Sequence, residues 1–283
     1  MRRILIPVFS LIFLGLGQAA DPPQENLIGV AQSQAAAGEL KAAAAKIGAA
    51  IEQEPDVFLH QARARILSRL GQHESAAADY TAAIALADDR TQRAGLLQSR
   101  GVEHFFAGQA KASVADFDAF LKENPRRAPY HWQRGLSLYY AGDFDGSRKQ
   151  FEIHQKVNSR DVENAVWHFL CVARLKGVET AREHFIPIEG DRRVPMAQIH
   201  QLFAGEGTPR EVIAAVQAAG GNASDKRDHL CYAHLYLGLY FEALGESNAS
   251  LVHIKKAAVD YKMDHYMGKT AQVHWRLRRP KPR

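Results

Sequence analysis

Histidine and cysteine are the residues of this chain with the most potential for chemistry, but their spacing matches no catalytic or metal-binding motif. The sequence contains thirteen histidines and two cysteines. It has no His-Glu-x-x-His, no His-x-His and no two cysteines two residues apart, so nothing predicts a metal site. A Gly-x-Ser-x-Gly turn and a phosphate-binding glycine loop are also missing. We therefore expect a protein that is not an enzyme and that needs no metal and no cofactor.

One segment, residues 187–227, leaves an enzymatic alternative open. Prolines and glycines interrupt its helical pattern, and it carries six side chains that could act as acids or bases. No two of them have a recognisable spacing, so a hydrolase with its site in this segment is the less favoured hypothesis. The six residues are Glu189, Asp191, His200, Glu206, Glu211 and Asp225.

The elements that would position any site are pairs of short helices. In the unit Ala128 to Asp161, apolar residues at helical spacing predict a first helix over Tyr130 to Tyr140. Gly142 ends this helix because glycine readily adopts the left-handed conformation, and Asp143 caps a second helix that carries Phe151. Two antiparallel helices bury only one face against each other. The unit therefore needs neighbours, and we expect it to repeat.

Glycines in the turns between paired helices mark the repeats. They are separated by about 34 residues or about twice that number, and they are Gly38, Gly71, Gly108, Gly142, Gly177 and Gly245. Seven places before most of these glycines the first helix carries a small residue, such as Gly101 and Gly135, where the two helices are expected to cross closely. Nine places after them the second helix carries a large apolar residue, such as Phe117 and Phe151. This pattern resembles the tetratricopeptide repeat (TPR) family. The resemblance implies an all-α solenoid of helical hairpins in a right-handed superhelix, with a protein-binding function.

The predicted organisation divides the chain into a leader, a solenoid and a short tail. A signal peptide covers residues 1–20, the TPR solenoid covers 21–277, and a basic tail covers 278–283. Within the solenoid, repeats are expected at about 24–56, 57–90, 91–127, 128–161, 162–188 (degenerate), 189–227 (irregular) and 228–262, followed by a capping helix over 263–277. Cys171 and Cys231 fall on first helices nearly two repeats apart, so we expect two buried thiols rather than a disulfide.

The N-terminal segment predicts export. Arg2 and Arg3 precede an apolar run, Ile4 to Leu16, which is too short to span a bilayer comfortably, and small residues follow as a cleavage site. The expected location is periplasmic or secreted, without a transmembrane helix and without the cysteine of a lipid anchor. Removal of the segment lowers the formal net charge from +5 to +3. That small excess does not predict nucleic-acid binding.

Partner-binding residues follow from the family resemblance. In the family, first helices line a concave groove that holds a bound peptide or helix, and tryptophan, tyrosine and arginine often anchor interfaces. The alternative for Trp132 and Trp167 is packing between repeats. The implied groove residues are Arg65, Arg69, Gln98, Phe105, Trp132, Leu136, Tyr139, Trp167 and Arg174.

Within the family, Tyr130 to Ala258 resembles the NlpI-like bacterial envelope lipoproteins. The shared features include the run Arg134 to Gly142 and the run Tyr236 to Tyr240. The resemblance implies a dimeric adaptor that brings a periplasmic C-terminal-processing protease together with cell-wall hydrolases, although the lipid-bearing cysteine is missing here. An alternative is a structural envelope protein that binds peptidoglycan through its basic tail.

Overall fold

The structure is a computed structural model that describes residues 37–280, and these residues form helices without strands. The predicted signal peptide and the first helix of the first repeat therefore lie outside the described residues. The elements in chain order are α2 (Ala37–Gln53), α3 (Val57–Arg69), α4 (His73–Leu86), α5 (Arg90–Phe106), α6 (Ala110–Glu123), the 3-10 helix η1 (Pro125–Tyr130), α7 (Trp132–Ala141), α8 (Phe144–Gln155), α9 (Val162–Lys176), α10 (Val178–Glu183), α11 (Met196–Ala204), α12 (Pro209–Ala218), α13 (Ala223–Ala243), α14 (Ser247–Lys255), the π-helix η2 (Lys256–Asp260) and α15 (Tyr266–Arg278).

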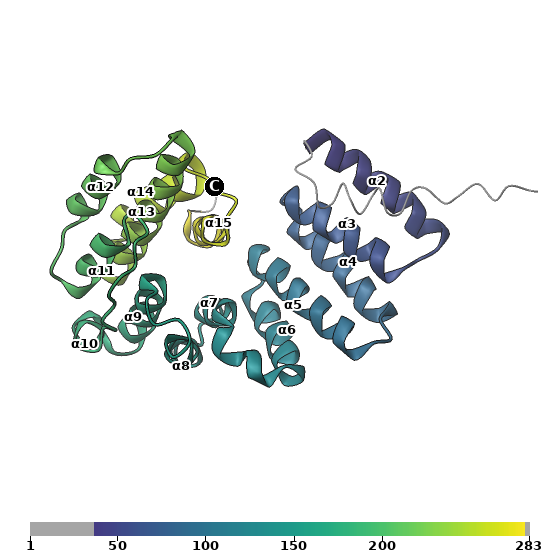
Figure 1. The fold of residues 1–283 in the computed structure, drawn as a ribbon, viewed down its shortest axis with the longest axis horizontal. Coiled ribbons are helices and arrows are strands. Elements are labelled where there is room, and N and C mark those ends of the chain that lie inside the picture. The colour runs from purple at the N-terminus through teal and green to yellow at the C-terminus, as the bar shows by residue number, and fades with distance from the viewer. Residues whose placement is uncertain (1–36, 281–283) are drawn as a thin grey trace, which may run out of the picture.

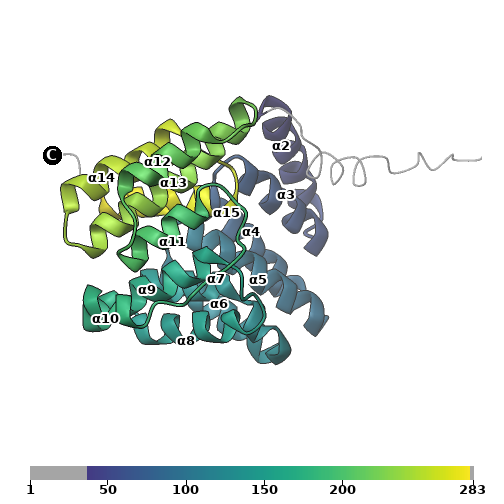
Figure 2. The same ribbon diagram turned by 60° about the vertical axis from the view of Figure 1, so that its left-hand side comes forward.

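The helices are stacked as a curved array in which neighbours along the chain pack against each other. Figure 1 shows α3, α5, α7 and α9 on the inner side of the curve and their hairpin partners on the outer side. The last helix, α15, lies inside the curve, and the turned view agrees (Figure 2). The predicted all-α hairpin solenoid is therefore confirmed. The final helix, α15, packs against the last hairpin and also against α5 inside the curve.

Five of the six predicted turn glycines have the expected positive φ angle. Their φ angles are between 75° and 90°, at Gly71, Gly108, Gly142, Gly177 and Gly245. The prediction for Gly38 was wrong, because Gly38 lies inside α2 instead of preceding it. The alanine-rich stretch that follows it is helical, so the low-complexity composition does not prevent a regular structure.

The close helix crossings occur where the small residues were predicted. A Cβ atom on Gly101 would lie 2.6 Å from the Phe117 ring, and one on Gly135 would lie 2.7 Å from the Phe151 ring. On α13, a Cβ atom on Gly238 would lie 2.5 Å from Ile254. Real side chains do not approach this closely, so glycine is required at these crossings.

Ion pairs join the two helices of successive hairpins, and the sequence analysis did not anticipate them. Arg63 of α3 bonds both carboxylate oxygens of the buried Asp79, at 2.7 and 2.6 Å. Arg100 of α5 bonds Asp116 in the same way, at 2.8 and 2.6 Å. Such two-pronged pairs fix geometry as well as supplying energy. They therefore hold α3 against α4 and α5 against α6 in a fixed register.

The irregular segment 189–227 folds as a short helical pair, α11 and α12. Thr208 and Glu211 form a reciprocal capping box at the start of α12. Met196, Leu202 and Val212 are fully buried against the neighbouring helices. The array therefore continues through this segment to α13.

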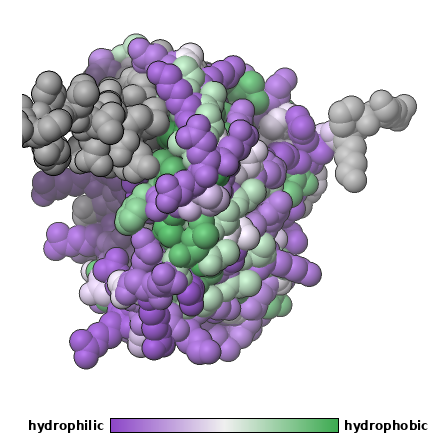
Figure 3. All heavy atoms as spheres, turned by 90° about the vertical axis from the view of Figure 1, so that its right-hand side faces the viewer, coloured by the Kyte–Doolittle hydropathy of each residue, from purple (hydrophilic) through white to green (hydrophobic). Residues whose placement is uncertain are grey.

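The N-terminal end of the array has apolar surface. Hydrophobic side chains gather there in a band bordered by hydrophilic ones (Figure 3). Phe58 of α3 is 58% exposed and Leu86 of α4 is 40% exposed. Within residues 37–280, no helix combines the length and the apolar character that crossing a membrane requires. Cys171 and Cys231 are both free and buried, as expected, and burial raises the pKa of each thiol to about 12.

Candidate functional site

The last helix fills the C-terminal half of the concave side. α15 packs against α5, α13, α14 and η2, and it lies beside α7 inside the curve (Figure 1). One of its faces is core, because Met267, Thr270, Ala271 and His274 are buried. The concave side is therefore divided into a part that the chain itself occupies and a part near α3 that it leaves open.

Aromatic contacts hold the start of α15 against the inner helices. The Tyr266 ring lies parallel to Phe105 of α5, with centroids 5.7 Å apart and an interplanar angle of 9°. It also meets Trp132 of α7 edge-on at 4.7 Å. The Tyr266 hydroxyl is buried without a hydrogen-bond partner. The contact of Tyr266 with the array is therefore made by its ring.

Polar contacts hold the rest of α15. The Tyr140 hydroxyl lies 2.9 Å from Nδ1 of His274, and Nε2 of the same ring lies 2.9 Å from a carboxylate oxygen of Glu242. Arg278 donates to Glu242 at 2.9 Å, and Arg276 donates to the carbonyl of Phe106. Burial alone would raise the pKa of Glu242, but His274 and Arg278 outweigh it and lower this pKa to about 2. The carboxylate is thus an anchor for the last two turns of α15.

The structure separates the predicted groove residues into three groups. Four pack inside the molecule and offer no surface to a partner in this conformation, namely Phe105, Leu136, Tyr139 and Trp167. Two are partly covered, namely Gln98 and Trp132. Three are exposed, namely Arg65, Arg69 and Arg174. The expectation that all nine line one open groove is therefore corrected. Phe105 and Trp132 pack against Tyr266 of α15, whereas Tyr139 and Trp167 pack against each other between neighbouring hairpins.

The partly covered and exposed residues have distinct environments. Gln98 donates to Gln133 at 3.0 Å and lies 2.6 Å from Nε2 of His131, so it links α5 to α7. Arg174 lies over the Phe144 ring at 5.0 Å, which is a cation–π contact on the C-terminal half of the array. Arg65 and Arg69 are four residues apart and so share one face of α3. Among the nine predicted groove residues, these two arginines are the exposed ones that lie near the open part of the concave side.

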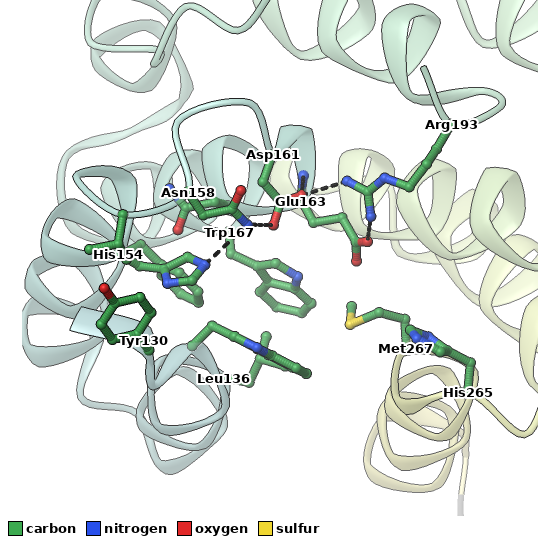
Figure 4. A pocket seen from close by; sticks show the side chains of 14 residues that line it. Tyr130, Leu136, His154, Asn158, Asp161, Glu163, Trp167, Arg193, His265 and Met267 are labelled. Carbon is green, nitrogen blue, oxygen red and sulfur yellow. Dashed lines mark hydrogen bonds and ion pairs between the residues drawn. The ribbon is translucent and has the colours of Figure 1, made fainter. Parts of the chain in front are cut away.

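A cavity of about 470 Å³ lies between α7, α8 and α9 on one side and the start of α15 on the other. Its apolar lining comes from Trp132, Leu136, Phe151 and Trp167, and Met267 of α15 lies opposite. Figure 4 shows the Met267 side chain pointing toward the Trp167 ring across this space. The volume is in the range of pockets that hold small ligands, about 300 to 1,000 Å³.

A cluster of ion pairs lies at the polar edge of the cavity (Figure 4). Arg193 donates to Asp161 and to Asp191, both at 2.6 Å, and also to Glu163. Tyr236 donates to the second oxygen of Glu163 at 2.6 Å. Burial raises the pKa of Glu163 to about 7, despite the opposing effect of Arg193. The cluster joins the irregular segment to the N-terminus of α9, whose dipole favours negative charge.

The acid and base candidates of segment 189–227 have structural partners. Glu211 and Asp225 cap α12 and α13. Asp191 accepts from the backbone N–H of Val162 at 3.2 Å as well as from Arg193, and the His200 ring bonds the carbonyl of Ile186 at 3.0 Å. Four of the six candidates are thus engaged in holding the fold. Among residues 37–280, no group of three or more His, Cys, Asp or Glu side chains could hold a metal ion.

Sequence reasoning missed Asn164, Glu163, Arg193 and Met267 at the cavity. Asn164 and Trp167 are three residues apart on α9, a spacing that places two side chains on one helix face. Asn164 lies in the first turn of α9, where asparagine is common, so the sequence alone did not mark it as a site residue. Arg193 and Met267 reach the cavity from distant segments, and no local pattern indicates them.

Comparisons with known proteins agree with this architecture. The chain is similar to a tetratricopeptide repeat protein from Parabacteroides merdae ATCC 43184, with 17% identity, a TM-score of 0.56 and coverage of 89% of this chain and 98% of that chain. It is also similar to YrrB, described as a TPR protein with an unusual peptide-binding site (16% identity, TM-score 0.40, 80% and 97% covered), and to the TPR domain of P58(IPK) (18%, 0.29, 89% and 63%). No family model matches the sequence.

The class of protein follows from the helical hairpins, their close crossings and the likeness to the Parabacteroides protein. The chain has the TPR fold, an all-α solenoid. The cavity beside α9 and the open half of the concave side are its candidate functional sites.

Proposed function

We propose that this protein is a non-enzymatic adaptor that binds other proteins on the open half of its concave side. The observation that carries the proposal is the exposed pair Arg65 and Arg69 on the inner helix α3, next to the region that α15 covers. Arginine side chains form forked hydrogen bonds with carboxylates and often anchor interfaces. The partner surface is therefore expected to carry Asp, Glu or a chain-terminal carboxylate.

The envelope is the proposed location, with a periplasmic C-terminal-processing protease and cell-wall hydrolases as the candidate partners. Support comes from the signal-like segment 1–20 and from the resemblance of Tyr130 to Ala258 to the NlpI-like proteins. An adaptor that holds two partners converts their encounter into an intramolecular event and so raises their effective concentration. A homodimer would double the number of partners held.

An affinity capture from an envelope extract of the host tests this proposal. The variant Arg65→Glu, Arg69→Glu reverses the charge of the α3 face, and Lys111→Glu, Lys122→Glu on the outer helix α6 is the matched control. Circular dichroism first establishes that both variants fold. We expect proteins retained by the wild type to be retained by the control and to fall at least tenfold in the α3 variant.

Two results would contradict the proposal. If both variants retain the same proteins as the wild type, the open half of the concave side is not the binding surface. If the wild type retains nothing above a mock column, the adaptor function itself fails.

A further inference from the structure

We infer that the cavity beside α9 binds the carboxamide side chain of a glutamine or asparagine in a protein partner. The inference rests on the proposed function, because it names a group that such a partner would insert. It concerns the C-terminal half of the array, whereas Arg65 and Arg69 lie on the open half. The two proposals can therefore be tested separately.

The cavity is lined by two buried polar side chains that each have an unpaired atom. The indole N–H of Trp167 and Oδ1 of Asn164 have no hydrogen-bond partner, and both side chains are only 2% exposed. One group is a donor and the other is an acceptor. They lie one turn apart on the same face of α9. Since unpaired buried polar groups are rare, a ligand that pairs both would be bound favourably.

A carboxamide has the matching chemistry. Its carbonyl oxygen accepts one hydrogen bond and its NH2 group donates two, so a single planar group can serve both atoms. The carbonyl would accept from Trp167, and an N–H would donate to Asn164. The His154 ring lies in the same cavity, where its Nδ1 donates to the carbonyl of Pro129 at 2.9 Å and its Nε2 lies 3.5 Å from the amide nitrogen of Asn158.

The ion-pair cluster makes a charged ligand a poor fit. Every carboxylate oxygen of Asp161 and Glu163 already accepts a hydrogen bond, from Arg193, Asn158, Tyr236 or the Glu163 backbone. A ligand carboxylate would meet these acids and an Arg193 guanidinium whose nitrogens already donate to Asp161, Glu163 and Asp191, and a ligand ammonium would find the oxygens of Asp161 and Glu163 already paired. The occupant is therefore uncharged.

The size of the cavity and the way into it also suit a side chain that enters together with its flanking residues. The cavity volume of about 470 Å³ exceeds what one carboxamide needs, and Tyr130, Trp132 and Val157 of its lining offer apolar contact for the rest of the segment. The unpaired atoms of Trp167 and Asn164 are closed to solvent. Met267 points toward the indole (Figure 4), and this flexible side chain can rotate aside to admit the ligand.

The test uses four probes that share one phenylpropyl skeleton, namely 3-phenylpropanamide, methyl 3-phenylpropanoate, 3-phenylpropanoate and 3-phenylpropylamine. The full chain has three tryptophans, so nuclear magnetic resonance gives three indole N–H signals. The variant Trp167→Phe assigns one of them to the cavity. We expect the amide to shift this signal, the ester to bind at least tenfold more weakly, and the acid and the amine to cause no shift.

Variants separate the ligand contact from a structural role. In Asn164→Leu the preference for the amide over the ester should disappear. In the control Gln155→Leu, which removes the partner that Asn164 Nδ2 bonds at 2.7 Å, the preference should remain. Equal binding of amide and ester to the wild type, or no shift of the Trp167 signal with any probe, would overturn the inference, and neither result depends on partner capture.

A second arm identifies the source of the carboxamide. Blocked peptides Leu-Gln-Leu and Leu-Glu-Leu are titrated against the same indole signal. If the glutamine peptide binds at least tenfold more tightly than the glutamate peptide, a protein side chain is supported as the ligand. Binding of the small amide without binding of either peptide would overturn the assignment to a protein partner.

Discussion

Tyr266, near the C-terminus, lies parallel to Phe105, in the third hairpin, with ring centroids 5.7 Å apart. This contact joins the end of the chain to a helix that the sequence places far upstream. Both rings belong to the same region of the inner surface as Trp132, which Tyr266 also meets. Part of the concave side is thus occupied by α15 of the same chain.

The buried hydroxyl of Tyr266 should reduce stability while its ring increases it. Tyr266→Phe removes a polar atom that has no partner and keeps the stacking, so the free energy of unfolding should rise by about 1 kcal/mol. Tyr266→Ala should lower it by about 3 to 5 kcal/mol because a large buried ring is lost. Urea unfolding followed by circular dichroism measures both. A loss of stability in Tyr266→Phe would show that the hydroxyl is paired.

The crossing of α7 and α8 should tolerate no side chain at Gly135. A Cβ atom there would lie 2.7 Å from the Phe151 ring, so Gly135→Ala should destabilise the protein by about 1 to 3 kcal/mol. Gly95→Ala on α5 is the control, since nothing lies within 4 Å of its Cβ position. The control should stabilise by about 0.5 to 1 kcal/mol, because alanine favours helix over glycine. Thermal unfolding that moves both variants in one direction would contradict the crossing geometry.

Glu163 should make the protein less stable as pH rises through a window near neutrality. Burial raises its pKa to about 7 from an ordinary value of 4.5, so between these values the folded state binds more protons than the unfolded state. The free energy of unfolding therefore falls with rising pH in that window, by on the order of 1 to 3 kcal/mol from this group. Relative to wild type, Glu163→Gln should gain stability from pH 4.5 to 7. If the urea midpoints of wild type and Glu163→Gln differ by a constant amount across that range, the pKa of Glu163 is not raised.

Glu242 should show the opposite dependence. Its pKa is lowered to about 2, so the stability it supplies is present above pH 4.5 and is lost as pH falls toward 2. Glu242→Gln should therefore be less stable than wild type at pH 7, and the two proteins should converge in acid. The same urea series measures this difference. A constant gap down to pH 2 would mean that Glu242 acts through packing rather than charge.

Much of the fold could be predicted because its determinants are local. The turn glycine Gly142 and the crossing partners Gly135 and Phe151 lie within one hairpin, so a single period of sequence contains the whole interaction. The capping box of Thr208 and Glu211, at the start of α12, is equally local. Gly38 was misassigned because a glycine near a helix start has the same local appearance as one in a turn.

The site was less predictable because its contacts join distant segments. The hydrogen bond from Arg276 to the Phe106 carbonyl spans 170 residues, and the ion pair of Arg193 with Glu163 spans 30. Phe105 and Trp132 were correctly placed on first helices, yet nothing in their own repeats indicates that Tyr266 of α15 would pack against them. Only the packed structure shows which part of the inner surface is occupied.

The return of α15 to α5 also has a mechanical consequence. An open solenoid can lengthen and shorten like a spring, because each repeat touches only its neighbours. Here a tensile load along the array must first detach α15 from Phe105 and Phe106 before the intervening hairpins can spread. The C-terminal half should therefore resist extension as one rigid block, with elasticity confined to the hairpins before α5.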